Sequence, residues 1–393
     1  MNEAEQRTRE RLLPLARRAL AHLEAGSTDL APSTRAMPVS AYSDPARFER
    51  EVARIWKRVP LALALGAELR EPGAYKALEV LGIPVLLVRG SDGLARAFVN
   101  ACRHRGAPLR EAGCGRALRF ACPYHAWAYD ERGALVAMFG ETTFGAVDRA
   151  ELALAPLPCA ERAGLVWVSL TPGGAFEIDA WLGEFAAQLA TLELGRWHVY
   201  LQRELPGPGW KVAWDGYLEG YHQGTLHPQT VGKNTLSNLM AVDAFGPHQR
   251  IVFGRKSLDS LRGVPEAHWD PAQHIRLIHS AFPNLSISGI LGDHCLVSQL
   301  YPAGSPGRTI TVQTILTERR PETPAAKQAA EDFSALTLQA VRDEDYWVGS
   351  AIQRGIDSGA LSSFVFGRNE PTLQHYHAWV ERLAADREPK EKW

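Results

Sequence analysis

Two short motifs, each with one cysteine and one histidine, constrain this chain more than any other feature. Cys102 and His104 form the first motif; seventeen residues follow His104, and the second motif then provides Cys122 and His125. Two thiolates and two imidazoles from two opposed loops are a ligand set that holds a metal ion or a metal cluster. We therefore expect the surrounding residues to fold so that both loops meet at one metal centre.

The order of these ligands distinguishes between two kinds of metal centre. A zinc finger places paired cysteines first and paired histidines on a following helix, whereas each loop here offers one cysteine and one histidine. The mixed order fits a Rieske [2Fe-2S] cluster, in which one iron takes both thiolates and the other takes both imidazoles. A structural zinc site is the alternative.

Composition excludes several classes of partner. The 393 residues include 43 basic and 44 acidic side chains, which gives a net charge of −1, so we expect no binding to nucleic acid or to an anionic membrane. The longest apolar stretches, such as residues 80–88, fall short of the roughly 20 residues that cross a bilayer. The N-terminal residues mix Glu3, Glu5 and Glu10 with arginines and lack an apolar core, so we expect no signal peptide and a cytoplasmic location.

The texture of the sequence changes twice along the chain and predicts three parts. Residues 1–57 predict a helical arm that packs with the C-terminal domain. Residues 58–172 contain short β-prone runs split by Gly, Asp and Pro, and predict a small antiparallel β domain that carries the cluster. Residues 173–393 predict antiparallel strands wrapped on a long helix that begins at Pro324 and ends near Ile356. The expected fold is α+β, with a C-terminal domain of the helix-grip type seen in START and Bet v 1-like proteins.

A second constellation lies well downstream of the cluster motifs. His222 and His227 are five residues apart, and Glu219 precedes the first histidine by three residues, about one helical turn. Two imidazoles and a distant carboxylate make the facial triad that holds ferrous iron with open positions for oxygen and substrate. Two histidines at this spacing are weak evidence alone, but after a Rieske motif they indicate a mononuclear iron site.

On these residues the chain resembles the catalytic α subunit of the Rieske non-heme iron oxygenases, the aromatic ring-hydroxylating oxygenase superfamily. The likeness extends over nearly the whole chain. The resemblance implies the following ligands: Cys102 and Cys122 for one cluster iron, His104 and His125 for the other, and His222 and His227 for the mononuclear Fe(II).

The resemblance also assigns a role to Glu219. It matches a carboxylate that, in the family, bridges a cluster histidine of one subunit to an iron-binding histidine of its neighbour, and it therefore implies a homotrimer. The chain departs from the family pattern at two places. Ala126 stands where many relatives have glycine, and Asp215 and Gly216 stand where relatives usually carry a Glu-Asn pair.

The third iron ligand must be a carboxylate far along the chain, and the long C-terminal helix offers Asp343, Glu344 and Asp345. Helical periodicity favours Asp345, because it falls on an otherwise apolar stripe where a metal would offset the cost of burying a carboxylate. Glu344, on a neighbouring face, is the second candidate. The residues of the stripe are Leu338, Val341, Asp345, Val348 and Ile352.

The resemblance implies an enzyme that uses O₂ and electrons from an NAD(P)H-dependent reductase, with or without a ferredoxin. We expect it to monohydroxylate, dihydroxylate or oxidatively demethylate an apolar small molecule, aromatic or polycyclic in type. A Rieske electron-transfer protein with a non-catalytic partner-binding domain is the alternative. The residues expected to line or back the substrate pocket, most of them as core, are Phe245, Phe253, Leu258, Leu261, Ile278, Phe282, Leu285, Ile287 and Leu291.

Overall fold

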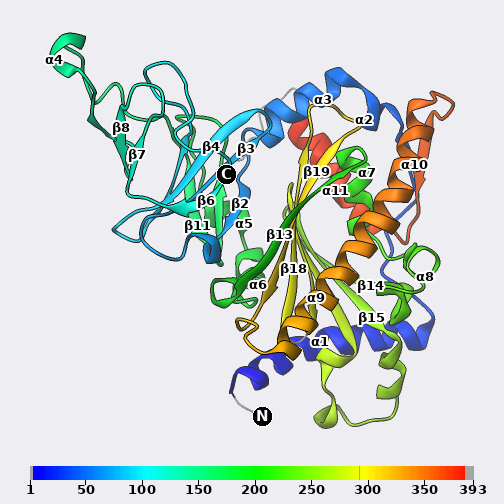
Figure 1. The fold of residues 1–393 in the computed structure, drawn as a ribbon. Helices are drawn as coiled ribbons and strands as arrows, with labels where there is room; N and C mark the ends of the chain where they lie inside the picture. The colour runs from blue at the N-terminus through cyan, green and yellow to red at the C-terminus, as the bar shows by residue number, and fades with distance from the viewer. Residues whose placement is uncertain (1–2, 292, 386–393) are drawn as a thin grey trace. The chain divides into compact units, whose positions relative to one another are not determined.

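Residues 50–197 form a unit of short antiparallel strands, which we call the β unit. The computed structural model describes residues 3–291 and 293–385 (Figure 1). The β unit contains three sheets with the orders β10-β5-β4-β3-β6, β11-β12-β2 and β7-β8-β9. Its strands are β2 (Leu61–Leu65), β3 (Ala74–Val80), β4 (Ile83–Arg89), β5 (Ala95–Val99), β6 (Gly113–Arg116), β7 (Arg119–Ala121), β8 (Ala128–Asp130), β9 (Leu135–Ala137), β10 (Pro156–Leu157), β11 (Cys159–Arg162) and β12 (Leu165–Val168).

Short helices fill the connections and the exit of the β unit. They are η1 (Val52–Trp56), η2 (Gly66–Leu69), α4 (Glu141–Phe144), α5 (Ile178–Leu182), α6 (Phe185–Ala190) and η3 (Leu194–Arg196). Residues 50–57 and 173–197 thus group with the β unit, whereas the sequence prediction assigned them to the helical arm and to the C-terminal domain.

A single apolar core supports the two cysteine loops of the β unit. Leu86, Phe98 and Phe120 are buried in this core together with Cys102 and Cys122 themselves. Because protein interiors are close-packed and yield little, burial of the cysteines in this core fixes the positions of the loops that carry them.

The second unit, which we call the helix-grip unit, comprises residues 3–49 and 198–385. Its seven-stranded antiparallel sheet has the order β13-β19-β18-β17-β16-β15-β14. The strands are β13 (His198–Gly207), β14 (Thr235–Phe245), β15 (His248–Arg255), β16 (Ile275–Ala281), β17 (Leu285–Leu291), β18 (His294–Pro302) and β19 (Thr309–Thr317). A separate small ribbon pairs β1 (Arg35–Pro38) with β20 (Ser363–Phe366).

The predicted long helix crosses this sheet as three consecutive segments (Figure 1). They are α9 (Pro324–Leu338), the π-helical segment η8 (Gln339–Asp345) and α10 (Tyr346–Asp357). Thr323 caps the start, since its side chain accepts a hydrogen bond from the amide of Ala326, and Pro324 occupies the first helical turn. Phe333 packs on Leu296 and Ile315 of the sheet. The α+β prediction, with an antiparallel sheet wrapped on a long helix, is confirmed.

The other helices of the helix-grip unit complete its layers. The N-terminal helix α1 buries Leu12, Leu15 and Leu20 against Val252 and Leu239 of the sheet. No helix of the described residues is both long and apolar enough to span a membrane. The helices are α1 (Glu3–Ala25), α2 (Ser40–Ser43), α3 (Pro45–Glu51, ending inside the β unit), α7 (Trp210–Leu218), α8 (Gln223–Leu226), η4 (Val231–Lys233), η5 (Lys256–Leu261), η6 (Glu266–His268), η7 (Pro271–Gln273) and α11 (Pro371–Ala384).

Candidate metal centres

The two cysteine loops of the β unit have the same backbone construction. In the first, the amide of Cys102 donates to a carbonyl five residues later at 2.9 Å, and its carbonyl accepts from the amide of Gly106 at 2.8 Å. In the second, the equivalent distances for Cys122 and Ala126 are 2.7 and 3.0 Å. Gly106 and Ala126 both have left-handed backbones, with φ of 75° and 56°. The sequence therefore builds two matched turns, each with a cysteine at its base.

The side chains on these turns form a set of four metal-donor groups, two thiols and two imidazoles. The rings of His104 and His125 have centroids 4.6 Å apart, and Trp127 stacks on His104 at 4.9 Å. The Nδ1 atoms of both histidines are buried without a hydrogen-bond partner among the described residues, and Cys102 and Cys122 are buried free thiols. Buried polar atoms are rarely left unpaired, so the two imidazole nitrogens, together with the two thiols, fit a metal cluster that would satisfy them.

Tyr129 lies against the first of these cysteines. Its hydroxyl is 3.4 Å from the Sγ of Cys102 and accepts a hydrogen bond from the amide of Arg103 at 3.0 Å. Burial raises the pKa of Tyr129, and the hydrogen bond to Cys102 raises it further. The phenol therefore keeps its proton and can donate it to a thiolate ligand.

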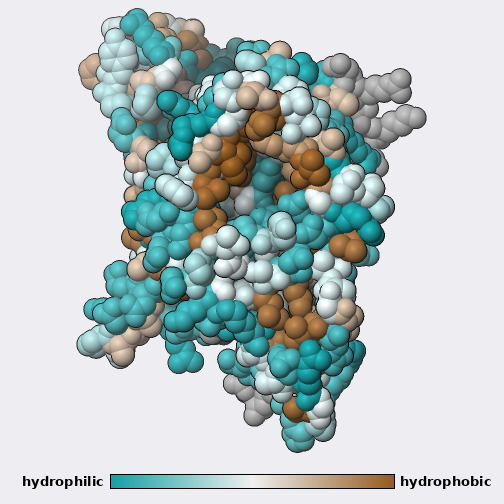
Figure 2. All heavy atoms as spheres, turned by 90° about the vertical axis from the view of Figure 1, so that its right-hand side faces the viewer, coloured by the Kyte–Doolittle hydropathy of each residue, from teal (hydrophilic) through white to brown (hydrophobic). Residues whose placement is uncertain are grey.

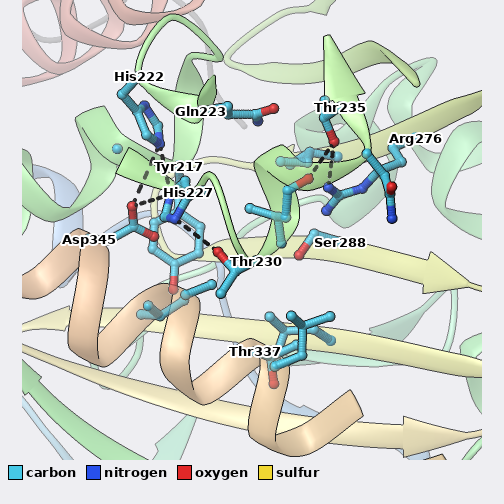
Figure 3. Close-up of a pocket in the computed structure, with 18 of the residues that line it drawn as sticks. Tyr217, His222, Gln223, His227, Thr230, Thr235, Arg276, Ser288, Thr337 and Asp345 are labelled. Atoms are coloured by element: carbon cyan, nitrogen blue, oxygen red, sulfur yellow. Dashed lines mark hydrogen bonds and ion pairs between the residues drawn. The ribbon is translucent and has the colours of Figure 1, made fainter. Parts of the chain in front are cut away.

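In the helix-grip unit, His222 and His227 flank the single turn of α8, and Asp345 ends the π-helical segment η8 (Figure 3). The two Nε2 atoms are 3.2 Å apart. Asp345 Oδ1 lies 2.9 Å from the Nε2 of His227 and 3.6 Å from the Nε2 of His222. One donor atom from each residue falls within 4.8 Å of the others, a separation that a single metal ion can bridge. Two imidazoles and one carboxylate are the donor set of a mononuclear non-heme iron site.

Two further carboxylates hold the opposite nitrogens of the imidazoles. Glu219 contacts the Nδ1 of His222, and Glu344 Oε2 lies 2.5 Å from the Nδ1 of His227. Thr230 donates its hydroxyl to the same oxygen of Glu344 at 2.5 Å. Burial alone would lower the pKa of His227, but its contacts with Asp345 and Glu344 raise it. Each imidazole can thus donate from Nδ1 and keep the Nε2 lone pair for a metal, the arrangement common to metal-bound histidines.

The backbone around Glu219 differs from the expected helical turn. The helix α7 ends at Leu218, and Glu219 itself has an extended backbone with φ of −135° and ψ of 165°. Its carboxylate folds back and accepts hydrogen bonds from the amides of Tyr221 and His222. The three-residue spacing therefore brings Glu219 to His222 through a tight turn rather than along a helix face.

The π-helical segment also changes the expected apolar stripe. A π-turn inserts one residue, so the face that is buried before it differs in register from the face that is buried after it. Val341 is buried, but Ile352 is 41% exposed, and Tyr346 and Gly349 are buried instead. Asp345 lies where the register of the buried face changes. The apolar stripe therefore does not continue through Val348 and Ile352. The expectation of one apolar face along the whole helix was wrong.

The pocket beside Asp345 is more polar than expected. Of the nine apolar residues predicted to line or back it, Ile278 lines it; the side chain of Leu291 lies outside the described residues. Phe253, Phe282 and others of the nine are core residues. Besides the three donors, the polar and charged residues that line it are Tyr217, Glu219, Gln223, Thr230, Asn234, Thr235, Arg255, Arg276, Ser288 and Thr337.

Arg255 and Arg276 were not identified from the sequence. Each lies within or next to an apolar run of a strand, Arg255 after Val252 and Phe253, and Arg276 between Ile275 and Leu277. An arginine within or next to an apolar run of a strand is the signal that would have indicated them, because removing a cation from water costs free energy unless a partner offsets it.

Asp215, one of the residues at which the chain departs from the family pattern, contacts side chains of two other helices. Its carboxylate accepts from the hydroxyl of Tyr42 at 2.6 Å and lies 2.8 Å from the Nε2 of His377, which is fully buried. Asp215 therefore ties α7 to α2 and α11. Gly216 lines the pocket and has open space where a side chain would be.

Comparison with known proteins agrees with this pair of centres. Residues 60–145 match the family model of the Rieske [2Fe-2S] domain, and residues 194–386 match that of the ring-hydroxylating alpha subunit, catalytic domain. The chain belongs to the Rieske non-heme iron oxygenases. Enzymes of this family are mono- and dioxygenases that carry a Rieske cluster and a mononuclear iron and that take electrons from a reductase.

Two curated oxygenase subunits illustrate the relationship. The carnitine monooxygenase oxygenase subunit of Acinetobacter pittii is 33% identical over 196 residues, 49% of this chain and 52% of that protein, so the match spans about half of the relative. The glycine betaine monooxygenase oxygenase subunit of Pseudomonas aeruginosa is 24% identical over 367 residues, which cover 82% of this chain and 83% of that subunit.

Solved structures of the family share the fold. The quaternary ammonium Rieske monooxygenase CntA in complex with an inhibitor has a TM-score of 0.79 at 22% identity, covering 90% of this chain and 97% of that one. Naphthalene 1,2-dioxygenase from Rhodococcus sp. has a TM-score of 0.73 at 19% identity, covering 96% and 99%.

Proposed function

We propose that this Rieske oxygenase is a monooxygenase that oxidises a methyl group of a small, polar ammonium compound. Fe(II) is held by His222, His227 and Asp345, and the [2Fe-2S] cluster by the four donors of the β unit. The single observation that carries the proposal is the convergence of two Nε2 atoms and one carboxylate oxygen, all within 4.8 Å of one another, at the wall of a polar pocket.

When bound, the two metal centres would supply the electrons and the oxygen chemistry. The overall step consumes O₂, two electrons and two protons, inserts one oxygen atom into a methyl C–H bond and releases water. A hydroxymethyl group on nitrogen then leaves as formaldehyde. The residues of the chain hold this site in shape: Glu344, itself held by Thr230, orients His227, and Glu219 orients His222.

The polarity of the pocket separates this substrate class from an aromatic hydrocarbon. Arg255, Arg276 and Thr235 line it, while Tyr217 and Phe333 are the only aromatic side chains among its described lining residues. Burying these polar groups against a hydrocarbon would leave them unpaired, which costs binding free energy. The relatives named above act on carnitine and on glycine betaine. The expectation of aromatic hydrocarbon catabolism is therefore not supported.

The proposal includes a homotrimer in which electrons cross between subunits. Glu219 and His222 line a second cavity, whose rim includes the exposed side chains of Val365 and Ile352, 72% and 41% accessible. Apolar side chains also gather around a hollow on the side of the molecule where α10 lies (Figure 2). A solved structure of a quaternary ammonium Rieske monooxygenase gave insights into inter-subunit electron transfer in that enzyme. A neighbouring subunit's cluster domain would cover such a surface and meet Glu219 there.

We also propose three domains for the chain and a source for its electrons. Residues 58–172 would form the cluster domain, residues 173–393 the mononuclear iron domain, and residues 1–57 an arm that packs on the latter. A reductase, with or without a ferredoxin, would deliver electrons from NAD(P)H in the cytoplasm.

Iron content and product analysis test the function together. Purified protein should contain about three irons per chain, two in the cluster and one in the mononuclear site. With a reductase, O₂ uptake should depend on carnitine, γ-butyrobetaine or glycine betaine and should release one formaldehyde per O₂ consumed. Diol products from naphthalene without turnover of any ammonium compound would contradict the substrate class. A content of two irons, without substrate-dependent O₂ uptake, would favour the electron-transfer alternative.

A further inference from the structure

We infer that the pocket contains an anion subsite, in which Arg255 and Arg276 bind a carboxylate of the substrate while the reacting carbon lies near His222, His227 and Asp345. The inference rests on the proposed function for the reacting end of the molecule. It adds a second requirement, that the substrate carries a carboxylate at its other end.

The sheet brings the two arginines together. Arg255 pairs in register with Thr235 on β14, and Arg276 lies on the next strand, β16, opposite Phe253. One terminal nitrogen of Arg276 donates to the hydroxyl of Thr235 at 3.1 Å. All three polar side chains line the same pocket as the metal donors. Figure 3 shows Thr235 and Arg276 on the opposite side of this pocket from His222 and Asp345.

Neither guanidinium has a carboxylate partner among the described residues. The Nε atoms of Arg255 and Arg276 are buried without a hydrogen-bond acceptor in this part of the chain. Burial and, to a smaller extent, the charge of Arg255 together lower the pKa of Arg276 to about 10. Burial also lowers the pKa of Arg255. Two neighbouring cations without a counter-charge destabilise the folded protein, and an anionic ligand would offset that cost.

Two other arginines of the chain form ion pairs with carboxylates, as expected for arginines with a structural role. Arg89 is buried and its guanidinium lies 2.5 Å from a carboxylate oxygen of Glu161. Arg250, on the same strand as Arg255, lies 2.8 Å from a carboxylate oxygen of Asp243. The two pocket arginines lack such a partner among the described residues and face the cavity instead. A carboxylate suits them because its two oxygens can each accept hydrogen bonds from guanidinium groups.

Binding measurements on the iron-loaded holoenzyme, without O₂, test the subsite directly. One series compares glycine betaine, γ-butyrobetaine and carnitine with choline, which lacks the carboxylate. A second series compares benzoate with benzamide. In whichever series binds, we expect the compounds with a carboxylate to have at least about tenfold higher affinity than the compound without one, since hydrogen bonds to charged groups are among the strongest in proteins.

Substitutions locate the effect at the two arginines. Arg276→Gln and Arg255→Gln should each weaken carboxylate binding by roughly 10- to 100-fold and leave choline or benzamide binding unchanged. Both variants should unfold at the same or a higher temperature than wild type, because each removes a partly buried charge that has no carboxylate partner among the described residues. The matched control is Arg250→Gln, which loses the ion pair with Asp243 and should unfold at a lower temperature with carboxylate affinity unchanged.

The binding results distinguish a failure of the anion subsite from a failure of the proposed substrate class. If benzoate binds through the arginines and no ammonium compound binds, the anion subsite stands and the proposed substrate class fails. If no carboxylate in either series binds more tightly than the compound that lacks the carboxylate, or if both pocket variants leave that preference intact, the inference is wrong whatever the enzyme oxidises. Lower unfolding temperatures for both variants, with affinity unchanged, would assign the arginines a structural role.

Discussion

At the scale of single residues, the roles of the acidic side chains near the two histidines follow from which imidazole nitrogen each one faces. Asp345 faces the Nε2 atoms of both rings, whereas Glu219 and Glu344 face the Nδ1 atoms. A carboxylate at Nδ1 accepts the ring N–H and thereby fixes the neutral tautomer with a free Nε2 lone pair. We therefore propose Asp345 as the metal ligand and Glu219 and Glu344 as orienting groups.

This placement predicts different results for two adjacent acids. Asp345→Ala should empty the mononuclear site, because it removes one of three protein ligands, and should leave about two irons per chain and a normal Rieske spectrum. Glu344→Gln should keep the site but weaken its iron affinity by roughly 10- to 100-fold, since it only loosens the orientation of His227. Iron titration of the two variants checks this. An empty site in Glu344→Gln and a full one in Asp345→Ala would reverse the assignment.

Ala126 predicts a stabilising substitution. It has φ of 56° in the second cluster loop, at the position equivalent to Gly106. A left-handed backbone costs a non-glycine residue about 1–2 kcal/mol, and glycine relieves this at a smaller entropic cost. Ala126→Gly should therefore raise the free energy of unfolding by about 0.5–1 kcal/mol and leave the cluster spectrum unchanged. Thermal unfolding measures the gain. The control is Ala128→Gly in strand β8, which should lose stability; a loss in both variants would contradict the argument.

At the scale of secondary structure, residue spacing along the chain predicts sites whose residues lie within one short segment. It does not predict sites whose residues are brought together by the register of a strand pair or of a helix. The cysteine loops and the pair His222 and His227 each lie within one short segment, so their spacing carries the geometry. The apolar stripe through Asp345 assumed a regular α-helix, and the π-turn in η8 moved the buried face after it. No local sequence pattern indicates the residue that the π-turn inserts.

The pair of arginines in the sheet is a second feature that residue spacing could not predict. Arg255 and Arg276 are far apart in sequence and come together because β15 pairs with β16 in one particular register. The length of the connection, which contains η5, η6 and η7, does not by itself determine that register. The fold class was predictable because it depends on the order of strands and helices, which the sequence displays directly.

The π-helical segment predicts the effect of a deletion. Removing Asp343, which is exposed and contacts its neighbour Arg342, should convert η8 to regular α-helix while the flanking helices keep their packing. Glu344 and Asp345 should then no longer reach the two histidines together. We expect iron to fall from about three to about two per chain, with an unchanged Rieske spectrum. Asp343→Ala, which keeps the length, should retain all the iron; equal iron in both variants would contradict a role for the π-turn.

At the scale of the whole molecule, the two metal centres lie in different units, so electrons must cross from one to the other. Glu219 offers one half of a connection: its carboxylate contacts the ring of His222 and accepts from the amide of Tyr221, and it lines a cavity with an apolar rim. In the proposed trimer, the cluster domain of a neighbouring subunit provides the other half. Ring symmetry then gives every mononuclear site one donor from the next subunit.

Mixing two inactive variants tests this directly. His104→Ala lacks the cluster, Asp345→Ala lacks the mononuclear iron, and each alone should be inactive. Co-expressed with different tags and purified through both, mixed trimers should regain about a third of the wild-type rate per chain, because in either mixed composition one chain of the three keeps its iron and has a cluster-bearing neighbour on the correct side. Electron transfer within one chain would give no recovery.

Glu219→Gln then identifies the chain that provides the bridge. Placed in the His104→Ala chain, which keeps the mononuclear iron, it should abolish the recovered activity, because the bridging carboxylate belongs to the same chain as His222. Placed in the Asp345→Ala chain, which keeps the cluster, it should have no effect on the rate. Equal loss in both placements would contradict a directional bridge between subunits, and recovery that persists in both would remove Glu219 from the electron path.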